Sequence, residues 1–277
     1  MELFSSWTGS DFLLFYAGLL ALACLAAWWI PANLRAPGRH GTPDDLESVA
    51  ILAGGSARLA DSLLVDLYVR GAVTTLANGR LAVADARLAT SPADKALLAL
   101  DPPLRLGAVK RALAAHAERV AARLQRAGLL LRPEEHMRLR WLSITPFAAL
   151  LMLGLYRQRA GDAVGEPTGF LVVLLGVTLL LAIIRFFKSD PRTVAGIEAA
   201  RELRQRNGRV SRAPRPEEAA MAVALFGTAV LVGTPWEPVH AMRQQSGDSG
   251  GGGGDGGGGS SDGGSGCGGG GCGGCGG

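Results

Sequence analysis

The sequence predicts a mainly α-helical membrane protein: three transmembrane helices, a cytoplasmic helical, winged-helix-like domain and a disordered glycine-rich tail. Hydrophobic residues make up 48% of the 277 residues, and they gather in uncharged runs that approach the length needed to cross a bilayer. Residues 42–140 combine helical spacing of apolar residues with a hairpin signal. Residues 243–277 are mostly glycine and hold too few apolar side chains to build a core.

The first apolar run covers residues 12–30, after a short N-terminal segment at residues 1–11. As a helix its 19 residues would be about 28 Å long, and Trp28 and Trp29 stand near its end as interfacial aromatics do. A cleaved signal peptide is the alternative. No Lys or Arg precedes the run and no small-residue cleavage site closes it, so we expect a retained anchor and then a linker over residues 31–41.

The domain expected over residues 42–140 begins with two helices. Thr42 or Asp44 can cap the first helix, with Pro43 near its first turn, and Gly54-Gly55 breaks it. A second helix is expected over residues 56–69, because leucines recur on one side of it.

A hairpin and a longer helix complete this domain. Asn78-Gly79 stands between two short apolar segments, which is the strongest short-range signal for a hairpin. The order helix, helix and two-stranded wing is the basis for the winged-helix prediction. A further helix is expected over residues 106–126, where apolar residues follow helical spacing.

Two more apolar runs follow, at residues 141–156 and 169–187, joined by a short loop at 157–168. They predict a transmembrane hairpin, because flanking arginines can snorkel and aromatic residues can sit at the interface. A buried hairpin in a soluble protein is the alternative. Neither run has the polar face that such a helix would show.

Residues 188–242 turn basic, with a helix expected over residues 193–206 near the membrane surface. The alanine-rich stretch 219–233 follows. Because its apolar core is short for a span, we expect it to pack on the soluble part or lie on the membrane. A fourth span stays open as the alternative.

Arg and Lys are distributed unevenly between the segments. There are none before residue 12, sixteen in 31–140, two in 157–168 and nine in 185–216. The positive-inside rule then puts the N-terminus and the 157–168 loop outside. It puts the 42–140 domain in the cytoplasm, where we also expect the tail, and the membrane is then the inner (cytoplasmic) one.

The stretches "LAGGSARLADSLLVDLYVRGAV", "GEPTGFLV", "RTVAGIEAARELR" and "AMAVALFG", followed by a Gly/Cys-rich ending, resemble an uncharacterised bacterial membrane family. That family is named for its near-uncomplex ending, and the resemblance covers roughly residues 42–232 and the style of the tail. It implies membrane location and this architecture, and it supplies no catalytic residues. The acidic Asp162 and Glu166 depart from the basic loop of the family pattern.

Cys267, Cys272 and Cys275 are weak metal-ligand candidates in the tail. Their spacing matches the start of a plant-type iron–sulfur pattern, but the fourth cysteine is missing, and His240 would have to complete a site. Glycine also loses the most entropy on ordering. The alternatives are binding of a soft metal, thiol modification, or a flexible polar tail with exposed thiols. No cofactor is predicted.

No phosphate loop, HExxH, GxSxG or GxGxxG motif occurs, and the four histidines are scattered, as solvated surface residues are. The leading hypothesis is therefore a non-enzymatic membrane protein whose domain holds a protein partner. A membrane-tethered transcription regulator is the second hypothesis, and an enzyme with an unrecognised site is the third. Nucleic acid is disfavoured, because residues 56–70 offer only Arg58 and Arg70 against Asp61 and Asp66.

Overall fold

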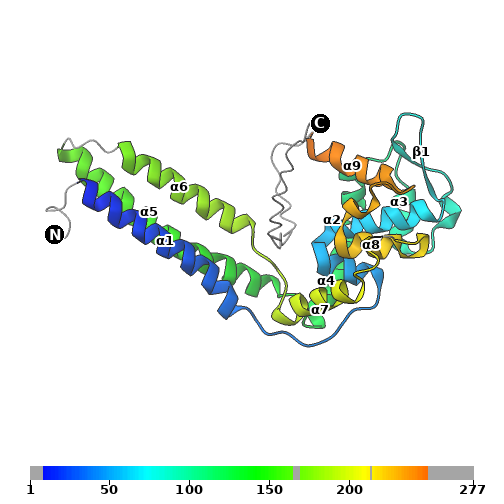
Figure 1. The fold of residues 1–277 in the computed structure, drawn as a ribbon, viewed down its shortest axis with the longest axis horizontal. Coiled ribbons are helices and arrows are strands. Elements are labelled where there is room, and N and C mark those ends of the chain that lie inside the picture. Colours follow the sequence, from blue (N-terminus) through cyan, green and yellow to red (C-terminus); the bar gives the residue numbers. More distant parts are fainter. Residues whose placement is uncertain (1–8, 165–168, 213, 249–277) are drawn as a thin grey trace, which may run out of the picture.

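The computed structural model describes residues 9–164, 169–212 and 214–248 of the chain. Helices dominate this part, as the sequence predicts, and the strands that it contains form one hairpin. Figure 1 shows two bodies, an elongated three-helix bundle and a compact helical domain, joined near one end of the bundle.

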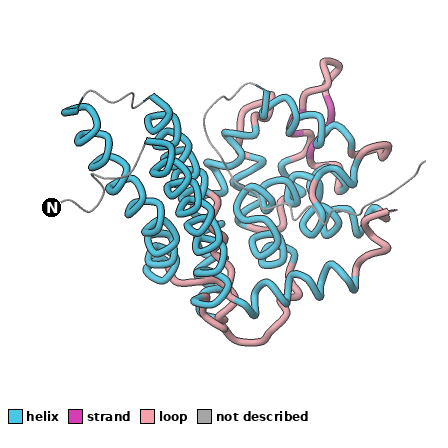
Figure 2. Tube along the Cα trace, turned by 60° about the vertical axis from the view of Figure 1, so that its left-hand side comes forward, coloured by secondary structure: helices cyan, strands magenta, loops and turns pink. Residues whose placement is uncertain are grey.

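The bundle consists of α1 (Gly9–Leu34), α5 (Pro133–Val164) and α6 (Gly169–Phe187). The three helices lie alongside one another in both backbone views (Figures 1 and 2). The bundle has its own small core, formed by Phe12, Tyr16, Ala23, Ala27, Phe147, Leu150, Leu171, Leu175 and Ala182. The buried hydroxyls of Tyr16 and Thr178 lie 3.1 Å apart and form a hydrogen bond between α1 and α6.

Two helices of the bundle are longer than their apolar runs. α1 continues through Pro31 to Leu34, so the expected linker at 31–41 begins later. α5 begins at Pro133 and extends to Val164, so it takes in the end of the expected domain and most of the expected loop at 157–168. The expectation followed apolar residues, whereas a helix needs only backbone hydrogen bonds and continues into polar sequence when nothing breaks it.

The domain is built around α2 (Leu46–Val69), which the other elements cover. These elements are β1 (Val73–Thr75), β2 (Leu81–Val83), α3 (Pro92–Leu98), α4 (Leu106–Arg126), α7 (Val194–Arg206), α8 (Ala219–Phe226) and α9 (Glu237–Asp248). Short 3-10 turns stand at η1 (Ala86–Leu88), η2 (Pro216–Glu218) and η3 (Thr228–Leu231).

The start of α2 differs from the expectation. Its N-cap is Asp45, whose Oδ2 accepts a hydrogen bond from the amide of Ser48 at 3.1 Å, and not Thr42 or Asp44. A side chain caps a helix only from the residue that precedes its first turn, and here that residue is Asp45. The Gly54-Gly55 break is confirmed as a kink, since Gly55 has φ +74°.

The predicted hairpin is confirmed, with Val73 paired to Val83 and Thr75 to Leu81 in antiparallel register. Gly79 has φ +73° in its turn. The winged helix itself is not shown: within the described residues the sheet has two strands, and no third strand joins it. The second half of α2, which would be the nearest equivalent of a recognition helix, is largely buried in the core.

Two other helices agree with the sequence prediction. α4 spans Leu106–Arg126 as expected and buries its apolar residues Val109, Leu113 and Val120. The alanine-rich stretch 219–233 forms α8 and η3, packed against α2 with Val223 and Leu225 almost fully buried. This stretch therefore belongs to the domain core, one of the alternatives that the sequence left open.

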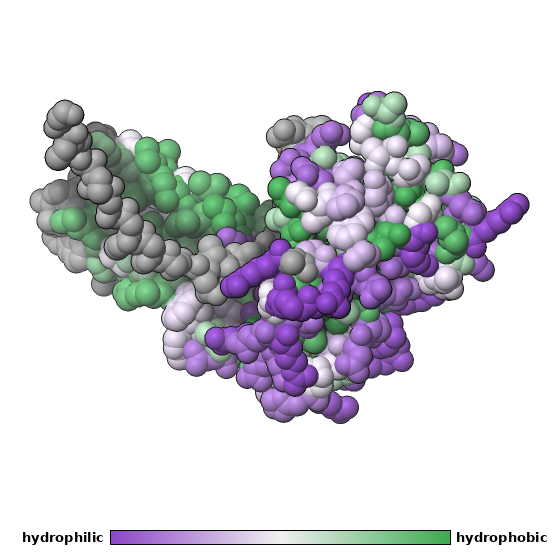
Figure 3. All heavy atoms as spheres, turned by 45° about the vertical axis from the view of Figure 1, so that its right-hand side comes forward, coloured by the Kyte–Doolittle hydropathy of each residue, from purple (hydrophilic) through white to green (hydrophobic). Residues whose placement is uncertain are grey.

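The two bodies have different surfaces. Figure 3 shows hydrophobic side chains over the bundle, whereas hydrophilic side chains cover much of the lower part of the domain. Most of the large apolar side chains that lie exposed belong to the bundle, among them Leu22, Leu25, Met152, Phe170, Val173, Leu179, Leu180 and Ile183.

Candidate functional site: a basic junction between bundle and domain

The backbone connects the bundle to the domain through three segments, 36–39, 128–131 and 191–195. The amide of Val194 donates to the carbonyl of Ala36 at 3.1 Å. The amide of Leu131 donates to Pro191 at 2.8 Å, in an isolated bridge that pairs Leu130 with Arg192. The ends of α1, α4 and α6 are thereby linked at one place.

Glycine is required where these segments cross. Gly38 has φ +77°, and a Cβ there would lie 2.4 Å from the carbonyl oxygen of Gly128. A Cβ on Gly196 would lie 2.1 Å from the carbonyl oxygen of Leu129. Both distances are shorter than any contact that a side chain tolerates, so the backbones approach this closely only without one.

Charged side chains cover this crossing. Arg35 donates from Nη1 to the carbonyl of Arg192 at 2.8 Å and lies 3.6 Å from Oδ2 of Asp190. Arg192 donates to the same carboxylate at 2.8 Å. Burial opposes ionisation of Asp190, but the hydrogen bonds and charge of Arg192, with the charge of Arg35, outweigh it and hold its pKa below the usual range.

Two arginines link neighbouring helices of the bundle near the junction. Arg140 of α5 donates from Nε to the carbonyl of Phe186 at 3.0 Å, and its guanidinium lies 4.1 Å from the centroid of the Phe186 ring. Arg185 of α6 donates from Nε to the carbonyl of Ala27 in α1 at 3.1 Å. Each arginine thus satisfies a main-chain carbonyl of a neighbouring helix.

A serine and a histidine also meet at the junction: Ser189 Oγ lies 2.7 Å from Nε2 of His136. A hydroxyl beside an imidazole is half of a nucleophile–base pair, which also needs a group that orients the imidazole. Within the described residues no carboxylate bonds the other ring nitrogen, and Asp190 is held by Arg192 and Arg35. The pair therefore lacks the geometry of a catalytic triad.

The junction carries an excess of positive charge. Its buried or partly buried charged side chains are the arginines 35, 140, 185 and 192 against the carboxylate of Asp190, and Lys188 adds an exposed cation. Guanidinium groups in such a setting offer fixed donors to an anion, with phosphate and carboxylate as the best geometric matches.

The domain has a second charged cluster. Arg243 of α9 donates to Asp61 of α2 at 2.9 Å, and Arg58 donates to the carbonyl of Val223 at 3.1 Å. Burial raises the pKa of Asp61 against the opposing effect of Arg243, and it lowers the pKa of Arg58. Arg204 donates to Leu225 and Ala53. These groups cap helix ends and tie α9 and α8 to α2, so the cluster is structural.

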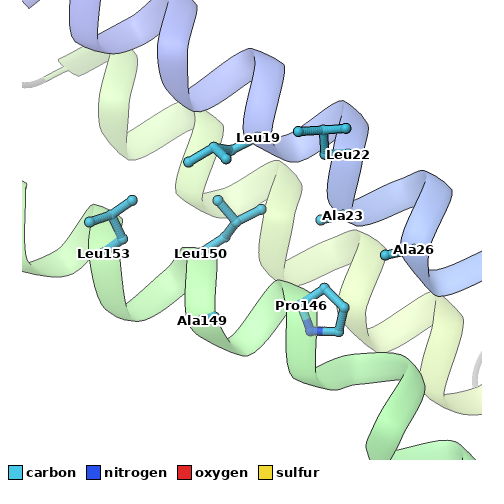
Figure 4. Close-up of a pocket in the computed structure, with 8 residues that line it drawn as sticks. All are labelled: Leu19, Leu22, Ala23, Ala26, Pro146, Ala149, Leu150 and Leu153. Carbon is cyan, nitrogen blue, oxygen red and sulfur yellow. The ribbon is translucent and has the colours of Figure 1, made fainter. Parts of the chain in front are cut away.

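An open groove lies on the bundle between α1 and α5 (Figure 4). It has a volume of about 320 Å³ and is lined by Leu19, Leu22, Ala23, Ala26, Pro146, Ala149, Leu150 and Leu153. All of these side chains are apolar. The groove therefore offers a surface for hydrocarbon and no chemistry of its own.

The sequence-based metal candidates Cys267, Cys272 and Cys275 lie outside the described residues. Cys24 is exposed on α1. His240, the residue needed to complete a site with the tail thiols, bonds Thr228 and Gln244, each at 3.0 Å. Among the described residues no three histidine, cysteine or acidic side chains gather in a way that could hold a metal ion.

The prediction of solvated histidines is right for His40 and wrong for the other three. His116 is largely buried, with Nε2 2.9 Å from Oε2 of Glu47, although not aligned for a hydrogen bond. His136 and His240 are half-buried and bond hydroxyls. An isolated histidine in sequence gives no sign of the partner that the fold brings to it.

Sequence reasoning also missed the junction as a site. Its signal was present, because arginines flank each apolar run, but these residues were interpreted only as topology determinants. Nothing local indicates that Arg35 meets Asp190 and Arg192, since these contacts join residues 155 and 157 positions apart.

No family model matches the chain, and neither a curated protein nor a solved structure matches it.

Proposed function

We propose that the chain is an integral membrane protein in which α1, α5 and α6 span the bilayer. They hold the domain formed by α2–α4 and α7–α9 at the cytoplasmic surface as a non-enzymatic binding module. One observation carries the proposal: these three helices are strongly apolar and yet mostly uncovered. In the most apolar 18-residue stretch of α1, α5 and α6, only 17%, 22% and 22% of the residues are buried within the protein. Apolar surface on this scale needs a lipid or protein environment to cover it.

α2 provides an internal comparison. Leu46–Val69 is also long and apolar enough to cross a membrane, but 78% of its apolar 18-residue stretch is buried within the protein. The protein therefore covers this helix itself and leaves the other three uncovered. This difference, and not length or composition, supports spans for α1, α5 and α6 alone.

Charge supports the orientation with the domain inside. Arg35, Arg140, Arg185 and Lys188 gather where the bundle meets the domain, whereas the far end of α5 carries Arg157 and Arg159. By the positive-inside rule we infer that the junction end faces the cytoplasm and the N-terminus the outside, in the inner membrane expected from the sequence. The resemblance to the near-uncomplex membrane family fits the same architecture.

A membrane-tethered transcription regulator is the second candidate, and the burial of α2 counts against it. A recognition helix must present its side chains to a groove, but Leu59, Leu63 and Leu67 of α2 lie in the core. A protein partner of the domain and a role for the tail thiols, through a soft metal or a modification, complete the proposed function.

Membrane extraction tests the proposal with a matched pair of variants. The full chain should resist alkaline carbonate and dissolve only in detergent. Leu180→Arg, at an exposed site in the middle of α6, should abolish integration, at a cost of about 2.5–3.5 kcal/mol at the centre of a span. Leu76→Arg, at an exposed site of the domain, should leave integration unchanged. If both variants behave as the parent does, α6 is a water-exposed helix and the proposal fails.

A further inference from the structure

The junction holds donors that the protein does not use. A guanidinium group has five N–H donors. Arg185 uses Nε for the Ala27 carbonyl and Arg140 uses Nε for the Phe186 carbonyl. Within the described residues no hydrogen-bond partner is recorded for the terminal nitrogens of either side chain, so both present a pair of donors.

These cations gather near the end of α6. Arg140 bonds the carbonyl of Phe186, the residue next to Arg185, and Arg35 lies 3.6 Å from the carboxylate of Asp190. Arg35 is largely buried, with 14% of its side chain exposed, and its nearest carboxylate, Asp190, is shared with Arg192. Like charges at a site with little water repel strongly, and an anion between them relieves that repulsion.

The depth of the cluster suits a lipid headgroup. Ala27, which Arg185 reaches, lies about 10 Å along the axis from the end of α1 at Leu34. Trp28 and Trp29 stand exposed at the same level, and exposed tryptophans occupy the headgroup region of a bilayer. The guanidinium of Arg185 therefore lies where the phosphates of a spanned bilayer would be, and Arg35 lies just beyond it on the side of the domain.

We propose that Arg35 and Arg185, with Arg140 beside them, bind the phosphate of an anionic phospholipid at the cytoplasmic interface. The inference rests on the proposed membrane-spanning function. Free phosphate offers the same oxygens, so the choice of a lipid depends on the position of the site at the interface. Glu134 and Glu135 do not replace the anion: both are exposed at the start of α5, and Glu135 accepts from the amide of Arg132.

Lipid binding by the purified full chain tests this assignment. The unfolding midpoint in neutral detergent is measured with phosphatidylglycerol, with phosphatidylcholine and with inorganic phosphate at equal phosphate concentrations. Phosphatidylglycerol should raise the midpoint, and the other two should not. The double variant Arg35→Gln/Arg185→Gln should lower the affinity for phosphatidylglycerol at least about tenfold, as the loss of charge-assisted hydrogen bonds implies.

Two further variants separate charge from structure. Arg35→Lys/Arg185→Lys keeps both charges and should retain most of the affinity even if the glutamine pair folds poorly. Arg157→Gln removes a cation at the opposite end, where the guanidinium lies 5.7 Å from the Phe12 ring centroid, and should leave the affinity unchanged.

Four results would overturn the inference: no preference for phosphatidylglycerol over phosphatidylcholine, an equal effect of inorganic phosphate, an equal loss in the lysine and glutamine pairs, or an equal loss in Arg157→Gln. Carbonate extraction of the same protein distinguishes the two proposals. A protein that resists extraction but lacks the lipid preference refutes the inference alone, and a protein that is extracted refutes the proposed function as well.

Discussion

Arg185 donates a hydrogen bond to the carbonyl oxygen of Ala27, the carbonyl that Pro31, four residues later, has no amide to reach. In an uninterrupted helix the amide of residue 31 would bond this oxygen. Proline removes that donor, and a guanidinium from another helix replaces it. The replacement explains how α1 continues past Pro31 to Leu34 and how α6 is fixed to it.

This relationship predicts a coupled pair of substitutions. Arg185→Gln should destabilise the bundle by about 1–3 kcal/mol, because it leaves the carbonyl of Ala27 without a partner. In a Pro31→Ala background the restored amide satisfies that carbonyl, so the same substitution should cost at least about 0.5 kcal/mol less. Denaturant unfolding of the four proteins in detergent measures the cycle. Additive effects would mean that Arg185 does not stand in for the amide that Pro31 lacks.

Asp94 should make the domain sensitive to acid. Burial opposes its ionisation, but hydrogen bonds from Thr90, Arg70 and Ser91 outweigh it and hold its pKa below the usual value. Its ionised form thus contributes stability that is present above the unfolded pKa of about 3.9 and is lost as pH falls through the lower folded pKa.

Asp94→Asn should therefore destabilise the domain near neutral pH by about 1.5–3 kcal/mol. The difference in stability between this variant and the parent protein should become smaller as the pH falls from about 5 to about 3. Thermal unfolding across this range measures it, with Asp101→Asn as a control at an exposed aspartate. If the stability difference between variant and parent stays constant with pH, Asp94 stabilises the domain through its shape and not through its charge.

Leu113→Ala separates the core of the domain from the surface of the bundle. Leu113 lies on α4 with 1% of its surface exposed, so truncation should destabilise the domain by about 2–5 kcal/mol. Membrane integration should not change, because the buried residues of α4 pack in the core of the domain. Limited proteolysis together with carbonate extraction reports both properties. Loss of integration in this variant would mean that the domain and the bundle fold as one unit.

The sequence predicted the elements whose structure depends on residues close together in the chain. α4 was predicted with its observed bounds because its apolar period and the Gly128 that follows it are both visible in the sequence. The hairpin was predicted because Asn78-Gly79 favours only a few turn types. The ends of α1 and α5 were not predicted, since hydropathy marks where a helix meets apolar surroundings and not where its backbone hydrogen bonds stop.

The junction was beyond local reasoning for another reason. Arg35 and Asp190 meet only after three chain segments have crossed at Gly38, Gly128 and Gly196. Each glycine is individually unremarkable in sequence, because nothing nearby shows which backbone will approach it. Burial of α2 was equally hidden, since its composition resembles that of a span and only its contacts distinguish it.

The tail should be dispensable for folding. The last helix that the structure describes, α9, packs through Val239 and the Arg243–Asp61 ion pair. A chain ending at Asp248 keeps both contacts and loses Cys267, Cys272 and Cys275. It should unfold at the same temperature as the full chain, whereas a chain ending at Trp236 should be destabilised because Asp61 loses its partner. A lower midpoint for the first truncation would give the tail a structural role.

The central claim is that a membrane separates the two ends of the bundle, and cysteine labelling tests it most directly. In a background without the four native cysteines, Ala115→Cys reports on the exposed face of α4 and Arg159→Cys on the far end of α5. In cells with a permeabilised outer barrier, an impermeant thiol reagent should label Cys introduced at 159 and reach the one at 115 only after the inner membrane is disrupted. Equal labelling of both positions before disruption would contradict the account.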